Sequence, residues 1–149
     1  MAFPSLKPVV LLDATSVATN ATNTSILDTM GFDFAQISVD MATADTTTHV
    51  PTMLKLSEGD TTDSTAFSDI SGFVGGTGAT NFSFGTPKTA VANLYVFNVD
   101  LRARKRYIKL SVTPVTPQIV SAAVFLARAE NSPSVAGTAR SGCAILVEG

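Results

Sequence analysis

The stretch of sequence that decides the fold is VANLYVFNVDLRARKRYIKLSVT, residues 91–113. Large apolar residues occupy every second position on both sides of a basic cluster, namely Tyr95, Phe97, Val99 and Leu101 before it and Ile108, Leu110 and Val112 after it. A period of two is typical of strands that bury one face. The stretch therefore predicts an antiparallel sheet with one basic end.

The basic cluster holds five of the ten Lys and Arg residues of a chain whose net charge is only −2: Arg102, Arg104, Lys105, Arg106 and Lys109. The positive field is therefore local, and we expect its partner to be an acidic surface or a polyanion. Direct nucleic-acid binding is disfavoured, because the chain is acidic overall, has no Trp and shows no RNP-like or zinc-finger spacing. Two interpretations stay open: a solvated strand end that opposes edge aggregation, and a contact with an acidic protein surface, which makes these five residues candidate interface residues.

The composition favours a β-rich assembly protein over a lone enzyme. A chain of 149 residues fits one domain, residues 1–149, which buries roughly 70% of its unfolded surface without a metal or disulfides. Only 15% of the residues are charged and 45% are hydrophobic, whereas about 25% charged is typical. Ser and Thr supply most of the remaining polarity, and neutral hydroxyls are less costly to bury against another subunit than charges. We therefore expect a homo-oligomer, with a trimer favoured and a dimer as the alternative.

Further strand-like runs lie outside the opening stretch, at residues 9–12, 35–41, 50–56, 122–128 and 143–147. Gly and Pro turn signals separate them, and helix patterns are almost absent. About eight short strands predict an all-β fold, a two-sheet antiparallel sandwich that is jelly-roll-like, with extended terminal arms and long loops. Residues 1–13 are expected to form an N-terminal arm, in which residues 9–12 are either a first strand or an extended segment that crosses a neighbouring subunit. Residues 131–142 are expected to form an extended loop.

Three local expectations follow from shorter patterns. Ser25 and Asp28 have the spacing of a helix-capping box, which predicts one helical turn. The apolar alternation changes parity after Phe34, so a bulge is expected near Ala35. Residues 72–85, GFVGGTGATNFSFG, are expected to form a long glycine-rich connection.

The side chains that usually carry catalysis are scarce. His49 is the one histidine, and its Thr-rich surroundings predict an exposed turn. Cys143 is the one cysteine, which excludes an intramolecular disulfide and favours a small buried residue. No Gly-x-Ser-x-Gly elbow is present. The sequence therefore predicts a protein that is not an enzyme.

Two motifs come near to a cofactor or metal site. Gly75-Gly-Thr-Gly78 lacks the Gly-Lys-Ser/Thr ending of a phosphate loop. Asp60, Asp63 and Asp69 lack the ligand order and the closing glutamate of an EF-hand. We predict neither cofactor nor metal.

The amino-terminal residues show no signal-peptide pattern, because Pro4, Lys7 and Pro8 interrupt the apolar run. No later run approaches the length of a membrane span. We expect synthesis in a reducing cytoplasm and no membrane partner.

Five segments together resemble small virion proteins of tailed bacteriophages: ILDTMGFDFAQISVDMATAD (26–45), LKLSEGD (54–60), FSDISGFVGG (67–76), VFNVDLRARKRYIKLSVTP (96–114) and AAVFLARAENSP (122–133). The most specific segment is DLRARKRYIK, residues 100–109. The resemblance implies a capsid decoration, or cement, protein with a β-sandwich or jelly-roll fold, which assembles as a symmetric oligomer on the capsid surface and binds the major capsid protein. It implies no catalytic residues.

Two other functions remain as alternatives. The first is another virion component, such as a head-tail adaptor, tail or fibre protein. The second is a carbohydrate-binding β-sandwich, which is less favoured because Trp is absent and only Tyr95 and Tyr107 offer polar aromatic platforms.

Overall fold

A computed structural model describes residues 6–42, 51–76, 81–82, 84 and 92–128, together with the backbone of residues 145–148. Apart from one 3-10 turn, Ser64–Ala66, the regular structure of these residues is all strand. The strands are β1 (Lys7–Val17), β2 (Asn23–Asp28), β3 (Phe34–Met41), β4 (Met53–Gly59), β5 (Ser68–Gly76), β6 (Asn93–Asp100), β7 (Tyr107–Thr113), β8 (Gln118–Ala127) and β9 (Ile145–Glu148). The prediction of an all-β fold is confirmed.

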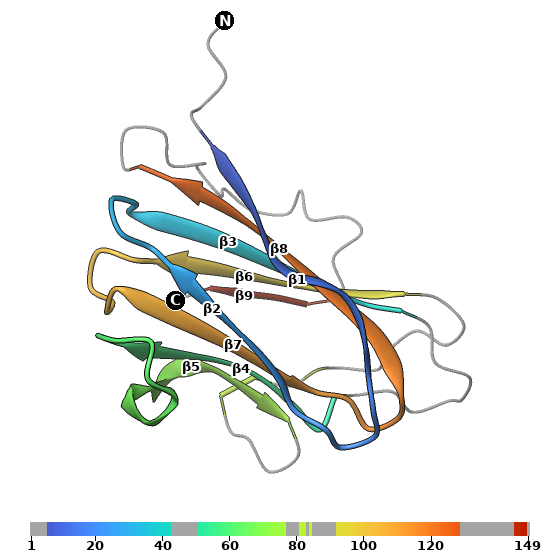
Figure 1. The fold of residues 1–149 in the computed structure, drawn as a ribbon. Coiled ribbons are helices and arrows are strands. Elements are labelled where there is room, and N and C mark those ends of the chain that lie inside the picture. Colours follow the sequence, from blue (N-terminus) through green and yellow to red (C-terminus); the bar gives the residue numbers. More distant parts are fainter. Residues whose placement is uncertain are drawn as a thin grey trace, which may run out of the picture.

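The strands form two sheets packed face to face, as Figure 1 shows. The five-stranded sheet has the order β1-β8-β3-β6-β9, and the four-stranded sheet has the order β2-β7-β4-β5. The first eight strands pair in a nested way, β1 with β8, β2 with β7, β3 with β6 and β4 with β5, all antiparallel. This nesting across two sheets is the jelly-roll arrangement. The predicted two-sheet sandwich is therefore confirmed, while β9 adds to it by pairing in parallel with β6.

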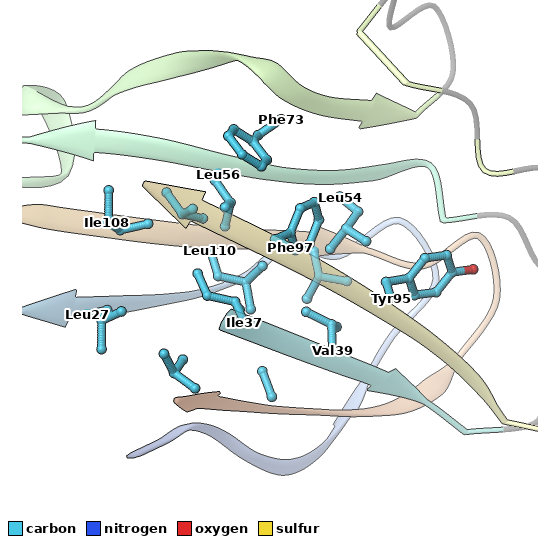
Figure 2. Close-up of a cluster of buried hydrophobic side chains, with 14 of the residues drawn as sticks. Leu27, Ile37, Val39, Leu54, Leu56, Phe73, Tyr95, Phe97, Ile108 and Leu110 are labelled. Carbon is cyan, nitrogen blue, oxygen red and sulfur yellow. The ribbon is translucent and has the colours of Figure 1, made fainter. Parts of the chain in front are cut away.

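The core lies between the sheets and is built by the period-two alternation of the strands. Along β3 and β6 the inward positions are buried, and Ile37 pairs with Phe97 at the centre of the five-stranded sheet. The Phe73 ring of β5 meets the Phe97 ring edge to face at 6.0 Å, which joins the two sheets (Figure 2). Aromatic pairs of this geometry stabilise a core beyond the area that they bury.

The strands β6 and β7 lie in opposite sheets, which corrects the expectation that the opening stretch forms one antiparallel sheet. β6 pairs with β3 and β9, whereas β7 pairs with β2 and β4. Residues 101–106 therefore cross from one sheet to the other. Alternation indicates which face of a strand is buried but does not indicate its neighbours.

Two further local predictions are wrong. Ser25 and Asp28 lie in β2, which pairs with β7 without a register shift, so pairing overrides the capping-box pattern. Near Ala35 there is no bulge, because β3 begins at Phe34 and pairs in regular register with both β6 and β8. Phe32, which suggested the change of phase, precedes the strand.

The glycine-rich segment begins as a strand rather than as a connection, since Gly72, Gly75 and Gly76 all belong to β5. Between the pairs Lys55↔Val74 and Ser57↔Asp69 the register shifts, and Gly72, with φ of +92°, lies in this bulge. A positive φ is accessible to glycine at little cost. Gly75 forms a bridge with Phe82, so part of the segment folds back on β5.

Several predictions concern residues outside the described ranges. These are His49, Cys143, residues 131–142 and the first five residues of the expected arm. The rest of that arm, from Lys7 onward, lies in β1 and pairs with β8. Within the described ranges, no helix has the length and apolar character needed to cross a bilayer.

Candidate interaction surfaces

Four residues of the basic cluster, Arg102, Arg104, Lys105 and Arg106, lie on the connection between β6 and β7, and the fifth, Lys109, lies in β7. Backbone hydrogen bonds hold this connection, from Leu101 N to Asp33 O at 2.8 Å and from Thr29 N to Arg106 O at 3.0 Å. Glu58 Oε2 accepts a further bond from Lys105 N at 3.0 Å. The connection is therefore fixed against two other segments of the chain, the connection between β2 and β3 and the end of β4.

Each cation of the connection has a carboxylate partner within the same chain. Arg102 pairs with Asp100, Arg104 Nη1 lies 3.8 Å from Glu58, Lys105 Nζ lies 2.7 Å from Asp60, and Arg106 Nη2 lies 2.7 Å from Asp28. The cluster is thus an alternation of charges, and its positive field is largely neutralised nearby.

Two of these carboxylates have strongly lowered pKa values. The hydrogen bond from Arg106 lowers the pKa of Asp28 to about 2, with a smaller effect of the bond from Met30 N. The hydrogen bond from Arg102 likewise lowers the pKa of Asp100 to about 2. Hydrogen bonds to the charged form favour ionisation. Both carboxylates are therefore ionised at neutral pH and remain paired.

Lys109, the fifth candidate, points to a different neighbour. Its Nζ lies 4.4 Å from the centre of the Phe67 ring and donates a hydrogen bond to Ser64 O at 3.4 Å. Arg102 and Arg106 also stack on rings, those of Phe34 and Tyr107, each at 4.9 Å. Such cation–π contacts further hold the basic side chains against the surface of their own chain.

Sequence reasoning missed most of the partners of the cluster. Asp100 is two residues from Arg102 and could have been found from that spacing. Glu58, Asp60 and Asp28 are tens of residues away and approach the cluster only through the pairing of β7 with β4 and β2.

The acidic residues considered as calcium ligands also have other roles. Asp60 pairs with Lys105, Asp63 accepts hydrogen bonds at the start of the 3-10 turn, and Asp69 binds Lys55 and Ser57. Among the described residues there is no group of three or more His, Cys, Asp or Glu that could hold a metal.

A second surface is the outer face of the five-stranded sheet, which we define by the outward residues of β1, β8, β3 and β6. Large apolar side chains are exposed on β1 and β8: Val10 is 68% exposed, Ile119 52% and Phe125 41%. Ile119 and Phe125 are six residues apart on one strand, a span of roughly 20 Å. Sequence reasoning did not single out this face, although the alternation of Ile119, Ser121, Ala123 and Phe125 carried the signal.

The outer face contains a hollow of about 310 Å³, lined by Val10, Leu12, Asp13, Ala14, Ser38, Asp40, Leu94, Ser121, Ala122 and Ala123. It lies over β8, where the small Ser121 and Ala123 stand between the large Ile119 and Phe125. On β1 the register shifts twice, and the second shift leaves Asp13 and Ala14 opposite Ser121. Bulges of this kind redirect side chains.

No protein-family model, curated protein or solved structure matches the chain.

Proposed function

We propose that the chain is a structural virion protein of the decoration, or cement, type. In this role it lies on the capsid surface of a bacteriophage and stabilises the shell by binding the major capsid protein across capsomer boundaries. The observation that carries the proposal is the outer face of the five-stranded sheet, where Val10, Ile119 and Phe125 are exposed. Large apolar side chains exposed on one face of a folded domain favour burial against a partner.

The form of β1 supports contact through this face rather than through the sheet edge. β1 is an edge strand, and an edge of eleven residues could pair with another chain. Pro8 lacks a backbone donor, and two register shifts interrupt the regular pairing geometry. Both features discourage sheet extension. A partner would therefore be bound by side chains of the face.

We further propose that the chain acts as a homo-oligomer, with a trimer favoured, and without a catalytic role. A symmetric oligomer presents several copies of the outer face at once, and multivalency makes weak single contacts durable. Low overall charge suits burial in such an assembly.

The carbohydrate-binding alternative relied on two aromatic side chains, Tyr95 and Tyr107, and the first is buried. Tyr95 is 2% exposed, and burial raises the pKa of its hydroxyl to about 12. Its ring packs against Phe84 in the core at 5.6 Å. Tyr107 is covered on one side by the Arg106 guanidinium.

Electron microscopy of the intact particle tests the proposal. Density for the chain on the shell, across capsomer boundaries, is the expected result. Density on the portal axis, on the tail or on fibres would replace the decoration role with one of the other virion roles.

A matched pair of variants tests the proposed face. Phe125→Ser should lower the occupancy of the chain on heads, because it removes a large apolar side chain from the outer face. Ile26→Ser is the control, since Ile26 is 39% exposed on a strand of the other sheet and should leave occupancy unchanged. Equal loss in both variants would count against the outer face as the contact.

A further inference from the structure

We propose that the hollow on the outer face receives a cationic side chain, Arg or Lys, from the protein that covers this face. The inference rests on the proposed function only for the identity of that protein, here the shell protein. It reverses the polarity expected from the sequence, because the chain would contribute the acidic side of the contact.

The distribution of charge is the first argument. The cations of the connection between β6 and β7 are paired with carboxylates of the same chain, and Lys55 is paired with Asp69. By contrast, the carboxylates of Asp13 and Asp40 make no ion pair or hydrogen bond within the described part of the chain. Both line the hollow, so negative charge that no described residue neutralises is concentrated at this place on the outer face.

The placement of the two carboxylates is the second argument. Asp40 on β3 pairs with Ser121 on one side and with Leu94 on the other, so it stands in the row of residues that crosses the hollow. Asp13 reaches the same row from β1 through the bulge opposite Ser121. One bound side chain could therefore lie near both carboxylates.

The cost of covering the face is the third argument. If a purely apolar partner covered Val10 and Phe125, it would also desolvate Asp13 and Asp40. Burial of an unpaired carboxylate is strongly unfavourable. A partner that supplies a cation offsets this desolvation penalty. The apolar residues of the face alone would bind many apolar partners, whereas the two carboxylates favour those partners that carry a cation at the matching position.

The walls of the hollow indicate the kind of cation. Val10, Leu12 and Leu94 supply apolar surface, and the hydroxyls of Ser38 and Ser121 supply neutral acceptors. Arg and Lys bury an aliphatic stem along apolar surface while the charged group meets a carboxylate. Calcium prefers six to eight oxygen ligands, more than two carboxylates and two hydroxyls provide. A long basic side chain fits this lining better than a metal ion.

A titration with small probes tests the inference on the full-length chain. Nα-acetyl-arginine amide would be added at millimolar concentrations to ¹⁵N-labelled protein, and the amide signals of Ala14, Ser38 and Ser121 followed by NMR. Nα-acetyl-citrulline amide, which has nearly the same shape without the charge, is the matched control probe. The arginine probe should shift these signals in a saturable way, with an affinity at least about tenfold greater than that of citrulline.

Variants separate the site from general charge attraction. The double variant Asp13→Asn and Asp40→Asn should lose the difference between the two probes. The double variant Asp60→Asn and Asp63→Asn removes the same number of charges elsewhere and should keep the difference, since Asn also serves as a helix cap at position 63. Absence of shifts, equal response to both probes, or an unchanged response of the first double variant would overturn the inference.

The outcome for the hollow is distinguishable from the outcome for the proposed function. Binding of the arginine probe, together with electron microscopy that finds no chain on the shell, would retain the site and reject the decoration role. Full decoration of heads by the first double variant, although that variant no longer distinguishes the two probes, would retain the decoration role and show that the hollow takes no part in the contact with the shell.

Discussion

The Asp28 carboxylate accepts two hydrogen bonds from the Arg106 guanidinium, from Nε at 3.0 Å and from Nη2 at 2.7 Å. Asp28 ends β2 and Arg106 immediately precedes β7, the strand with which β2 pairs. This two-bond contact is the form in which a guanidinium recognises a carboxylate best. It fixes the connection from β6 at the point where it enters the four-stranded sheet.

Reversal of one charge of this contact should destabilise the fold. Arg106→Glu would place two carboxylates together, and the midpoint of thermal unfolding should fall. The swapped variant, Asp28→Arg with Arg106→Asp, should recover most of the loss, because it restores opposite charges. Differential scanning calorimetry of the single, double and wild-type proteins measures the coupling. A swap that recovers nothing would mean that geometry rather than charge determines the effect.

The same swap tests whether the basic cluster also binds a partner. Reversal of Arg104, Lys105 and Arg106 to Glu together would confound attachment with folding, because each cation opposes a carboxylate of its own chain. The swapped variant alters the positions of the surface charges while it keeps the pairing. We expect its occupancy on heads to stay near that of the wild type, as measured by quantitative gel analysis of purified particles. A strong loss, with the unfolding midpoint unchanged, would show that Arg106 contacts the shell.

Stability should fall as the pH is lowered from about 4 to about 2. The pKa values of Asp28 and Asp100 are about 2 in the fold, against an ordinary 3.8. A lowered pKa in the folded state contributes stability above the ordinary pKa, and this contribution is lost as the pH falls through the folded pKa. Urea unfolding across this pH range measures the slope. In the variant Asp28→Asn with Asp100→Asn the slope should be shallower, and an unchanged slope would assign the loss to other groups.

Substitution of Gly75 by Ala should destabilise the core. A Cβ at this position would collide with the Phe82 ring, which packs edge to face on Phe84 at 5.2 Å and on Phe97 at 5.9 Å. Overpacking of this kind costs about 1–3 kcal/mol, and chemical denaturation would measure it.

A control on the same strand is Ser71→Ala, which changes an exposed side chain and should alter the free energy of unfolding by less than about 0.5 kcal/mol. Shortening the opposing ring with Phe82→Leu should make Gly75→Ala less costly. If Gly75→Ala lowers the free energy of unfolding by the same amount in the wild type and in Phe82→Leu, the cost arises from the backbone rather than from the Phe82 ring.

Most individual strands were predictable from the sequence, but β2, much of β5 and the partners of the strands were not. The run Tyr107–Thr113 is a strand, as the alternation of Ile108, Leu110 and Val112 predicts, because one face must be buried, and Pro114 follows its end. That β7 leaves β6 and pairs with β2 and β4 depends on contacts between distant segments, which no local pattern records.

The candidate surfaces divide in the same way. The density of cations at residues 102–106 was visible in the sequence, but their neutralisation by Asp28, Glu58 and Asp60 required the fold. The hollow was not predictable either, because it depends on a bulge in β1 that brings Asp13 beside a row of residues from β8 and β3.

The nested pairing of the strands has a consequence for the way the chain folds. Of the four nested pairs, β4 with β5 joins strands adjacent in sequence, whereas β1 must wait for β8, about a hundred residues later. Closure of long loops slows folding, and folds dominated by such pairings form in milliseconds to seconds. We therefore expect the β4–β5 hairpin to form first. The pairs β3–β6, β2–β7 and β1–β8 should then form in that order, because each closes a longer loop than the one before. During synthesis β1 leaves the ribosome long before β8 exists to pair with it, so a chaperone would be engaged first at the amino-terminal strand.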